Sequence, residues 1–138
     1  MAYDGRSNTL YAVDGHRIRR IDAEGTVETV AGTGRAGKAA DGSHAMQASF
    51  GDLDGLVVDG NGNLFVADRS NNVVQEITPD GIVHTVAGSG RKGFAGDGGS
   101  ATAAQLDGPG ALAIDPAGNL YVADTANQRV RMIGKPGR

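Results

Sequence analysis

The sequence repeats itself, and this feature constrains the fold more than any other. Residues 86–133 match residues 30–77 at about 22 of 48 positions, at a constant offset of 56 residues. A more divergent copy opens the chain, over residues 1–31. A fixed period in this range is typical of solenoids, propellers and arrays, in which each unit buries apolar surface against its neighbours. We therefore expect a repeat protein of nearly three units.

Each unit predicts a meander of short antiparallel strands. In the best-preserved copy, aliphatic and β-branched runs alternate with turn residues such as Asp115-Pro116-Ala117-Gly118. Such runs are typical of strands, and Pro and Gly supply the backbone angles that tight reversals need. The expected strands are 112–115, 120–124 and 129–133 in this copy, 55–59, 63–68, 73–78 and 82–87 in the second copy, and stretches within 1–14, then 17–21 and 26–31, in the first copy.

Repeated four-stranded meanders predict an all-β fold, the β-propeller. One sheet cannot bury both of its faces alone, so each blade must pack on two neighbours. The first strand of each blade would line the central channel and the fourth would lie outermost. We expect one segment over residues 1–138, with blade 1 at about 1–31, a connector at 32–54, blade 2 at about 55–87, a connector at 88–110, and blade 3 at about 111–138 without its outermost strand.

The two long connectors share the pattern Gly-x-Gly-Arg-x-Gly, then Asp-Gly, then Ala-x-x-Ala. Matching sequence in both copies favours ordered loops, and residues 100–106 predict a helical turn with Ser100 as its N-cap. The glycine runs superficially resemble phosphate-cradling loops. Because that motif needs a preceding parallel strand and a following helix, turn geometry is the simpler interpretation.

Three blades are too few to close a ring, because propellers close with four to eight. Alone, the chain would leave apolar blade faces at both ends. We expect two chains to close a six-bladed ring as a homodimer, since twofold pairing is the commonest homo-oligomeric arrangement. An open fragment, or one that packs through other edges, is the alternative.

Charge and composition argue against several classes of partner. The formal net charge is −3 without charged blocks, and aromatic residues make up only 4% of the chain. Neither feature suits a nucleic-acid or membrane surface. The absence of cysteine excludes disulfides and thiolate metal sites. No apolar run approaches membrane length and no signal peptide is recognisable. Met1 stands where the other copies place a strand residue, so the chain is expected to be a piece of a longer protein.

No catalytic constellation is recognisable. His16, His44 and His84 occupy three different positions in the repeat, whereas a metal site needs converging ligands. Asp41 and Asp97 would each bring too few oxygens for Ca²⁺. We therefore expect no catalytic residue, no metal and no cofactor.

Arginines alternate along the third strand of the first and last units. Arg17 with Arg19, and Arg129 with Arg131, would each project onto one face of a blade. Phosphate contacts are one interpretation of these cations. The favoured interpretation is inter-blade hydrogen bonding to the Asp that closes the second strand.

Surface recognition is the remaining activity. Strand parity places the connectors and the turns between second and third strands at one end of the propeller, and loops on a rigid scaffold commonly bind ligands. A protein or small molecule is the expected ligand there. The candidate partner-binding residues are Arg35, Lys38, Asp41, Arg69, Arg91, Lys92, Phe94 and Asp97.

The pattern Ala-Ile-Asp-x-x-Gly-Asn-Leu-Tyr-Val-Ala-Asp-x-x-Asn-x-Arg-Val-Arg-x-Ile closely resembles the NHL repeat. The Val-Ala-Gly-x-Gly-Arg-x-Gly connector is similar to the bacterial and teneurin-type branch of that family. The second copy departs from the pattern at Val73 and Gln75, where Arg is typical. The positions of the repeat expected to be structural are Asp59, Asn63, Asp68, Asn71, Asp115, Asn119, Asp124, Asn127 and Arg129.

The resemblance implies a propeller of about six blades used as an interaction or sensor platform, in a secreted or extracytoplasmic parent protein. Some members of the family are peptide-amidating lyases and some bind RNA. We predict a non-catalytic binding scaffold, which self-assembles from half-propellers. A metal-dependent lyase or lactonase-like enzyme is the first alternative, and a designed or excised fragment without a ligand is the second.

Overall fold

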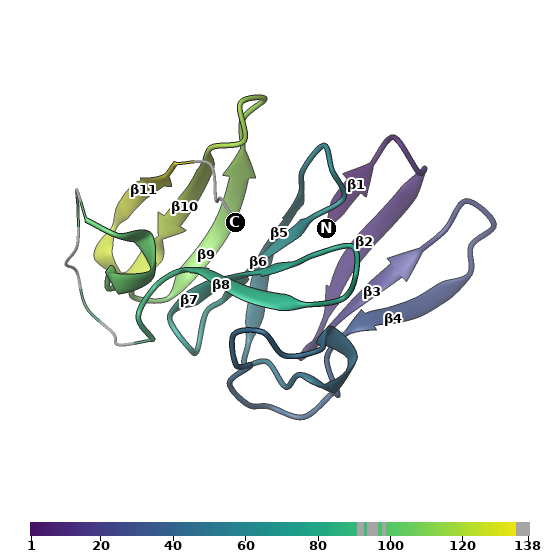
Figure 1. Ribbon diagram of the computed structural model, residues 1–138, viewed down its shortest axis with the longest axis horizontal. Helices are drawn as coiled ribbons and strands as arrows, with labels where there is room; N and C mark the ends of the chain where they lie inside the picture. The colour runs from purple at the N-terminus through teal and green to yellow at the C-terminus, as the bar shows by residue number, and fades with distance from the viewer. Residues whose placement is uncertain (91–92, 94–96, 98, 135–138) are drawn as a thin grey trace.

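A computed structural model describes residues 1–90, 93, 97 and 99–134 of the chain, which form three antiparallel sheets side by side (Figure 1). The sheets run in the orders β1-β2-β3-β4, β5-β6-β7-β8 and β9-β10-β11, so neighbours in sequence are neighbours in space. The strands are β1 (Ala2–Asp4), β2 (Thr9–Asp14), β3 (Arg17–Ile21), β4 (Val27–Ala31), β5 (Leu53–Val58), β6 (Leu64–Asp68), β7 (Val73–Ile77), β8 (Val83–Ala87), β9 (Pro109–Ile114), β10 (Leu120–Asp124) and β11 (Arg129–Ile133).

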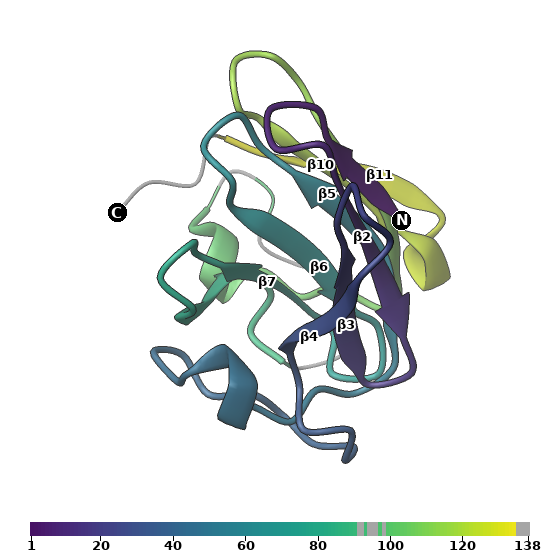
Figure 2. The ribbon, with the colours of Figure 1, turned by 90° about the vertical axis from the view of Figure 1, so that its right-hand side faces the viewer.

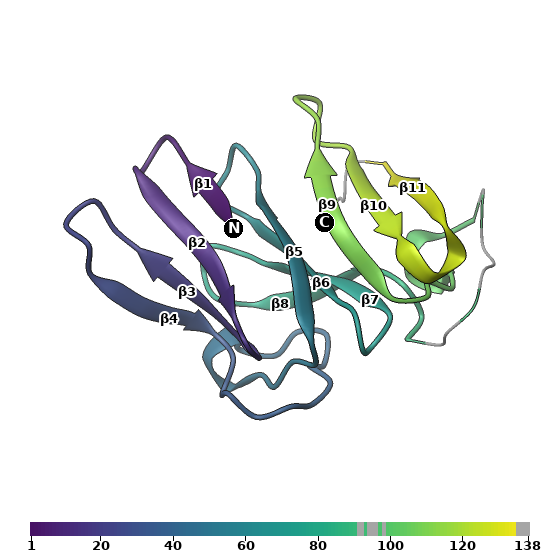
Figure 3. The same cartoon turned by 180° about the vertical axis from the view of Figure 1, so that it is seen from behind.

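This architecture confirms the all-β propeller prediction. The innermost strands β1, β5 and β9 follow one another across the molecule (Figure 3), while β4 and β8 lie at the outer edges of their sheets. The strands agree with the expected ranges except at the start of the innermost ones. There β5 and β9 begin earlier, at Leu53 and Pro109, and pair with their neighbours through a register shift. Such bulges bend a strand and leave no alternating pattern to recognise.

The connectors contribute short 3-10 turns, η1 (Ala45–Gln47) and η2 (Ala101–Ala103), and a third turn, η3 (Thr125–Asn127), joins β10 to β11. In Figure 2 the connector that carries η1, drawn in blue, lies below β3 and β4. The predicted helical turn is thus present at η2, with Ser100 at its N-cap position. The Ser100 side chain makes no cap hydrogen bond, because its hydroxyl pairs with that of Thr102 at 3.2 Å.

Two apolar clusters hold the three blades together. One lies between blades 1 and 2 and the other between blades 2 and 3. Each connector inserts one large side chain into its cluster, Phe50 in the first and Leu106 in the second. As a result, every residue of β6 and β7 in the middle blade is buried. In blade 3, by contrast, buried residues of β10 alternate with partly buried ones, and Arg131 is the one buried residue of β11.

Candidate interaction surface

The connectors and the turns between second and third strands meet at one end of the sheets, where they are tied together by hydrogen bonds. The Asn71 side-chain amide donates to the carbonyl oxygen of Gly37 at 2.7 Å, and its counterpart Asn127 donates to Gly93 at 2.8 Å. The backbone N–H of Arg69 donates to the carbonyl of Asp52 at 2.9 Å. These bonds make this end of the molecule an ordered platform.

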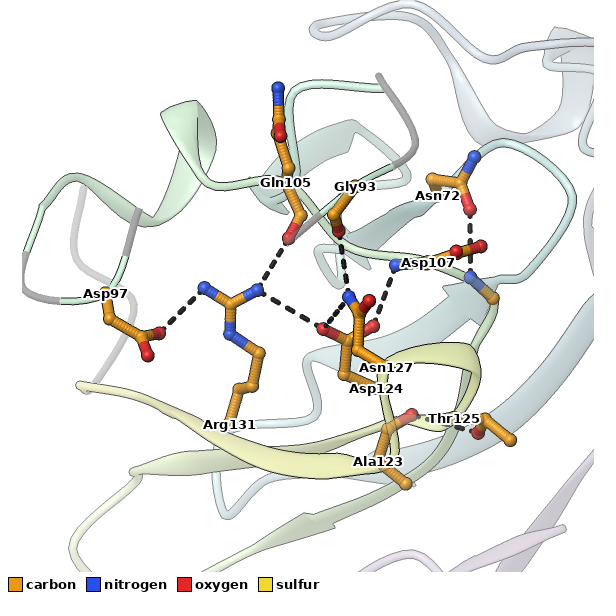
Figure 4. A network of polar contacts seen from close by, with 11 residues as sticks. Asn72, Gly93, Asp97, Gln105, Asp107, Ala123, Asp124, Thr125, Asn127 and Arg131 are labelled. Atoms are coloured by element: carbon orange, nitrogen blue, oxygen red, sulfur yellow. Dashed lines mark hydrogen bonds and ion pairs between the residues drawn. The ribbon is translucent and has the colours of Figure 1, made fainter. Parts of the chain in front are cut away.

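In blades 2 and 3, a buried aspartate at the end of the second strand anchors the corner, which is the reversal between the second and third strands. Asp124 Oδ1 accepts the backbone N–H of Asp107 at 2.7 Å, and Oδ2 accepts the Asn127 amide at 2.8 Å (Figure 4). In blade 2, Asp68 Oδ2 accepts the N–H of Gly51 at 3.0 Å and the Asn71 amide at 2.9 Å. The Asp and Asn side chains of the Asp-x-x-Asn pattern therefore hold the connector against the turn by hydrogen bonds to its backbone.

A buried arginine completes the corner of blade 3. Arg131 donates to Asp124 Oδ2 at 3.2 Å, to the Gln105 carbonyl at 2.6 Å and to Asp97 Oδ1 at 2.8 Å (Figure 4). Arg19 pairs with Asp14 of its own blade at 3.2 Å. The predicted Arg–Asp bonding is thus present, but the carboxylates belong to the same blade or its connector rather than to a neighbouring blade.

Blade 2 lacks this cation, because Gln75 stands at the position of Arg131. Its amide donates to the Ala39 carbonyl at 3.0 Å and to the Thr85 hydroxyl at 3.3 Å. Oδ1 of the fully buried Asp68 has no hydrogen-bond partner among the described residues. A buried acceptor without a donor costs free energy. Blade 2 therefore has a buried carboxylate oxygen without a donor at its corner, whereas both carboxylate oxygens of Asp124 in blade 3 accept hydrogen bonds.

We expect Gln75→Arg to raise the free energy of unfolding by about 1 kcal/mol, because a guanidinium would supply donors to Asp68. Urea unfolding of the purified chain measures the change. Gln75→Met is the matched control, since it fills similar space without a donor and should give no gain. An arginine variant no more stable than the methionine variant would contradict this account.

The five candidate binding residues that the structure describes divide into two groups. Arg35, Lys38 and Arg69 are exposed at the connector end. Asp41 and Asp97 are exposed as well, but each holds the scaffold: Asp41 Oδ1 accepts the backbone N–H of Thr85 at 2.8 Å, and Asp97 pairs with Arg131. The other three candidates, Arg91, Lys92 and Phe94, lie outside the described residues.

The histidines lie at separate places in the fold. His16 Nδ1 is 2.7 Å from the Gly51 carbonyl oxygen, which links the first turn to the following connector. His84 on β8 is 3.9 Å from Asp41 Oδ1, and His44 pairs with Ile82 in an isolated bridge. Within the described ranges, no group of three His, Cys, Asp or Glu side chains is placed to hold a metal ion. The same residues contain no helix long and apolar enough to cross a membrane.

The connector glycines have a geometric role. Gly32 and Gly88 have φ of 99° and 91°, which favours glycine. A Cβ atom at these positions would lie 2.5 Å from the His16 carbonyl oxygen and 2.4 Å from that of Asn72. Only glycine lets the connector pass this close to the turn, which confirms turn geometry as the reason for these two residues.

The opposite end of the blades carries a second kind of corner, at the reversal after the innermost strand. Asp115 Oδ1 accepts the Asn119 N–H at 2.8 Å, and Oδ2 accepts the Asn119 amide at 3.1 Å and the Tyr121 hydroxyl at 3.2 Å. The backbone bond from Asn119 is the main cause that lowers the pKa of Asp115. The negative charge of Asp115 in turn raises the pKa of Tyr121. Asp59 and Asn63 repeat this corner in blade 2.

Comparison with known proteins identifies the repeat. A family profile described as NHL repeat matches residues 106–132, which span the corner built on Asp124 and Asn127. The chain contains an NHL repeat. NHL repeats thus account for the blade sequence, and the two further copies of the unit extend the match beyond the profile.

Human teneurin-1 and teneurin-4 are similar to this NHL chain along almost all of it. They are 29% and 30% identical over 154 aligned positions, which cover 98% of the chain. The chain spans only about 6% of the length of these teneurins. The protein SUPPRESSOR OF QUENCHING 1 of Arabidopsis thaliana is 36% identical over 80 residues, or 57% of the chain and 7% of that protein.

Solved structures support the fold. A protein of unknown function from Bacteroides thetaiotaomicron superimposes with a TM-score of 0.83 at 23% identity, over 94% of the NHL chain and 33% of its own. An auxiliary nutrient binding protein from the same organism superimposes with a TM-score of 0.75 at 22% identity, over 99% of this chain and 37% of its own. A gluconolactonase from Xanthomonas campestris superimposes with a TM-score of 0.61 at 20% identity, over 88% of this chain and 32% of its own. At these identities the likeness concerns the blade architecture alone.

Proposed function

We propose that the chain is a non-catalytic interaction scaffold, in which two copies close a six-bladed ring and present the connector end to a ligand. The observation that carries the proposal is a contrast between equivalent positions of the repeat. Val74 and Glu76 of β7 are 0% and 1% exposed, because they face blade 3. Their counterparts on β11, Val130 and Met132, are 73% and 63% exposed.

The opposite terminal face has the same character. Val83 of β8 is 0% exposed beneath blade 1, whereas its counterpart Val27 of β4 is 50% exposed. Tyr3, at the position of Val58, is 60% exposed. A monomer rarely leaves large apolar side chains gathered on one face, and such faces commonly mark an interface.

A second copy suits both faces. At the junction between blades 2 and 3, Phe65 and Val74 of one blade pack with Leu120 and Val122 of the next. The outer face of blade 3 carries the counterparts of the first pair, and the outer face of blade 1 carries those of the second. Blade 3 of one copy can therefore meet blade 1 of another by the contacts already used inside the chain. Two copies give six blades, within the range of four to eight in which propellers close, whereas three would give nine.

The connector end supports the binding role. It is held by hydrogen bonds from both turns and blades, and Arg35, Lys38 and Arg69 are exposed on it. Cations on a rigid platform suit a protein or small-molecule ligand with acidic groups. The position of His16 supports a scaffold role, since its ring nitrogen Nδ1 lies 2.7 Å from the Gly51 carbonyl oxygen and so helps to hold the connector.

Light scattering coupled to size exclusion tests the ring. We expect the mass of two chains for the parent protein and of one chain for Val130→Asp, because a carboxylate would be buried at the junction. Met46→Asp is the matched control: Met46 is 55% exposed on η1, away from both terminal faces, so this variant should remain paired. A monodisperse parent monomer, or equal masses for both variants, would overturn the proposal.

A further inference from the structure

The corner of blade 2 contains two buried oxygens without a hydrogen-bond donor. Asp68 Oδ1 and the amide oxygen Oε1 of Gln75 have no partner among the residues that the structure describes, and the two residues are 0% and 1% exposed. Gln75 faces Val66 across β6 and β7, and Asp68 lies two residues after Val66, so both side chains emerge from the same face of the sheet. A carboxylate oxygen and an amide oxygen act only as acceptors. The corner therefore presents two buried acceptors on one face.

The equivalent corner of blade 3 shows what such acceptors bind. Asp124 and Arg131 lie 56 positions after Asp68 and Gln75. The guanidinium of Arg131 donates to Asp124 Oδ2 at 3.2 Å and to the Gln105 carbonyl oxygen at 2.6 Å (Figure 4). In blade 3 a cation thus stands between the carboxylate, the third strand and the connector.

The two buried carboxylates use their oxygens differently. In blade 3 the connector N–H bonds one oxygen of Asp124 and the side-chain amide bonds the other. In blade 2 a single oxygen, Oδ2 of Asp68, accepts both the Gly51 N–H at 3.0 Å and the Asn71 amide at 2.9 Å. Within the described part of the chain, the donors of this corner are all on one oxygen. Oδ1 of Asp68 is therefore available to a further partner.

Gln75 does not take over the role of the guanidinium. Its amide nitrogen donates to the Ala39 carbonyl at 3.0 Å and to the Thr85 hydroxyl at 3.3 Å, so both of its hydrogens are engaged away from Asp68. A glutamine side chain is also shorter and uncharged, so it cannot balance the carboxylate. A buried carboxylate without a paired charge is costly. These observations favour a cation from solution at this corner.

The oxygens at the corner indicate which kind of cation fits. They are one carboxylate oxygen from Asp68, one amide oxygen from Gln75 and the carbonyl oxygen of Ser49, which stands 56 positions before Gln105. Ca²⁺ sites commonly combine carboxylates among a larger set of oxygens. A single carboxylate balances a single positive charge, and neutral carbonyl oxygens can replace the hydration shell of a monovalent ion. The donor set therefore suits Na⁺ or K⁺.

We propose that the corner of blade 2 binds a monovalent metal ion, Na⁺ or K⁺, in the place that the Arg131 guanidinium takes in blade 3. Asp68 supplies the countercharge, and Gln75 and Ser49 supply neutral oxygens. The bound ion stabilises the blade, because it pairs a carboxylate that folding has removed from water. The proposal does not depend on ring closure or on a ligand at the connector end, since the site lies within one blade and its connector.

Thermal unfolding in chloride salts at equal ionic strength tests the proposal. We expect the unfolding midpoint of the parent protein to be about 4 °C higher in sodium or potassium chloride than in choline chloride, since an ion that binds only the folded state stabilises it. Choline carries the same charge but is larger than a guanidinium. Gln75→Arg should unfold at one temperature in all three salts, because its own guanidinium takes the place of the ion. Gln75→Met, which lacks the amide oxygen, should lose most of the difference.

Gln47→Arg is the matched control. It makes the same exchange of residues at an exposed position of η1, so it should keep the full salt response of the parent. Equal midpoints of the parent in the three salts, an equal response of Gln75→Arg, or stabilisation by calcium chloride alone would overturn the proposal. The comparison of salts does not use the mass of the assembly, so failure of the ring remains distinguishable.

Discussion

Replacing Arg131 by Gln is expected to lower the free energy of unfolding by about 3 kcal/mol, the scale of a broken buried ion pair. Arg131 is only 9% exposed and its partner Asp124 is 0% exposed. The guanidinium also bonds the Gln105 carbonyl and Asp97, so it joins the second strand of the blade, the third strand and the connector. The variant would leave Asp124 buried with backbone and amide donors but no cation. Chemical denaturation monitored by circular dichroism measures the loss.

The equivalent arginine of blade 1 provides the control. Arg19 pairs with Asp14 at the same 3.2 Å, but the two side chains are 30% and 64% exposed. Solvent screens such a pair, and Arg19→Gln should cost less than about 1 kcal/mol. Equal losses for the two variants would show that burial of the carboxylate does not set the strength of these corners.

Gly55→Ala is expected to destabilise the protein by about 3 kcal/mol, by forcing the two inner strands β5 and β9 apart. A Cβ atom at Gly55 would lie 2.5 Å from the Gly110 carbonyl oxygen, 2.7 Å from the Leu112 nitrogen and 2.9 Å from the Ala111 Cα. All three are backbone atoms of β9, so no side-chain rotation can relieve the contact. Thermal unfolding should shift to lower temperature and lose cooperativity between blades 2 and 3.

Gly60→Ala is the matched substitution. Gly60 lies in the turn that follows β5, and a methyl group at this position would have no heavy atom within 4 Å. It should change stability by less than about 0.5 kcal/mol, as exposed positions generally do. If Gly55→Ala were equally neutral, the inner strands would have to be free to separate without cost.

Blade order and most strand limits could be predicted from the sequence, because each depends on local alternation and turn residues. The early starts of β5 and β9 could not be predicted this way. Their first residues include Gly55 and Gly110, whose presence reflects the close approach of other segments rather than any local preference. A packing requirement between distant segments leaves no period to recognise.

The corners are predictable in part. The Asp-x-x-Asn spacing is visible in the sequence, and it indicates structural positions. Its partners are not visible, since Asp124 bonds the N–H of Asp107 in the connector, and Arg131 reaches Asp97 from 34 residues away. The bonding of Tyr121 to Asp115 joins an aromatic side chain to a turn and has no sequence signal of its own. These contacts appear only once the connector is folded back onto its blade.

Because each connector inserts one large side chain between consecutive blades and clamps the following corner, the junction is encoded entirely within one period of the sequence. An additional stretch of 56 residues, copied in frame, would bring its own inserted connector side chain, its own Asp and Asn at the corner, and its own sheet. Internal duplication could therefore lengthen the chain without redesigning any existing contact. The evolutionary unit would then be a blade together with the loop that precedes it, and ring size would change by gain or loss of whole genetic modules.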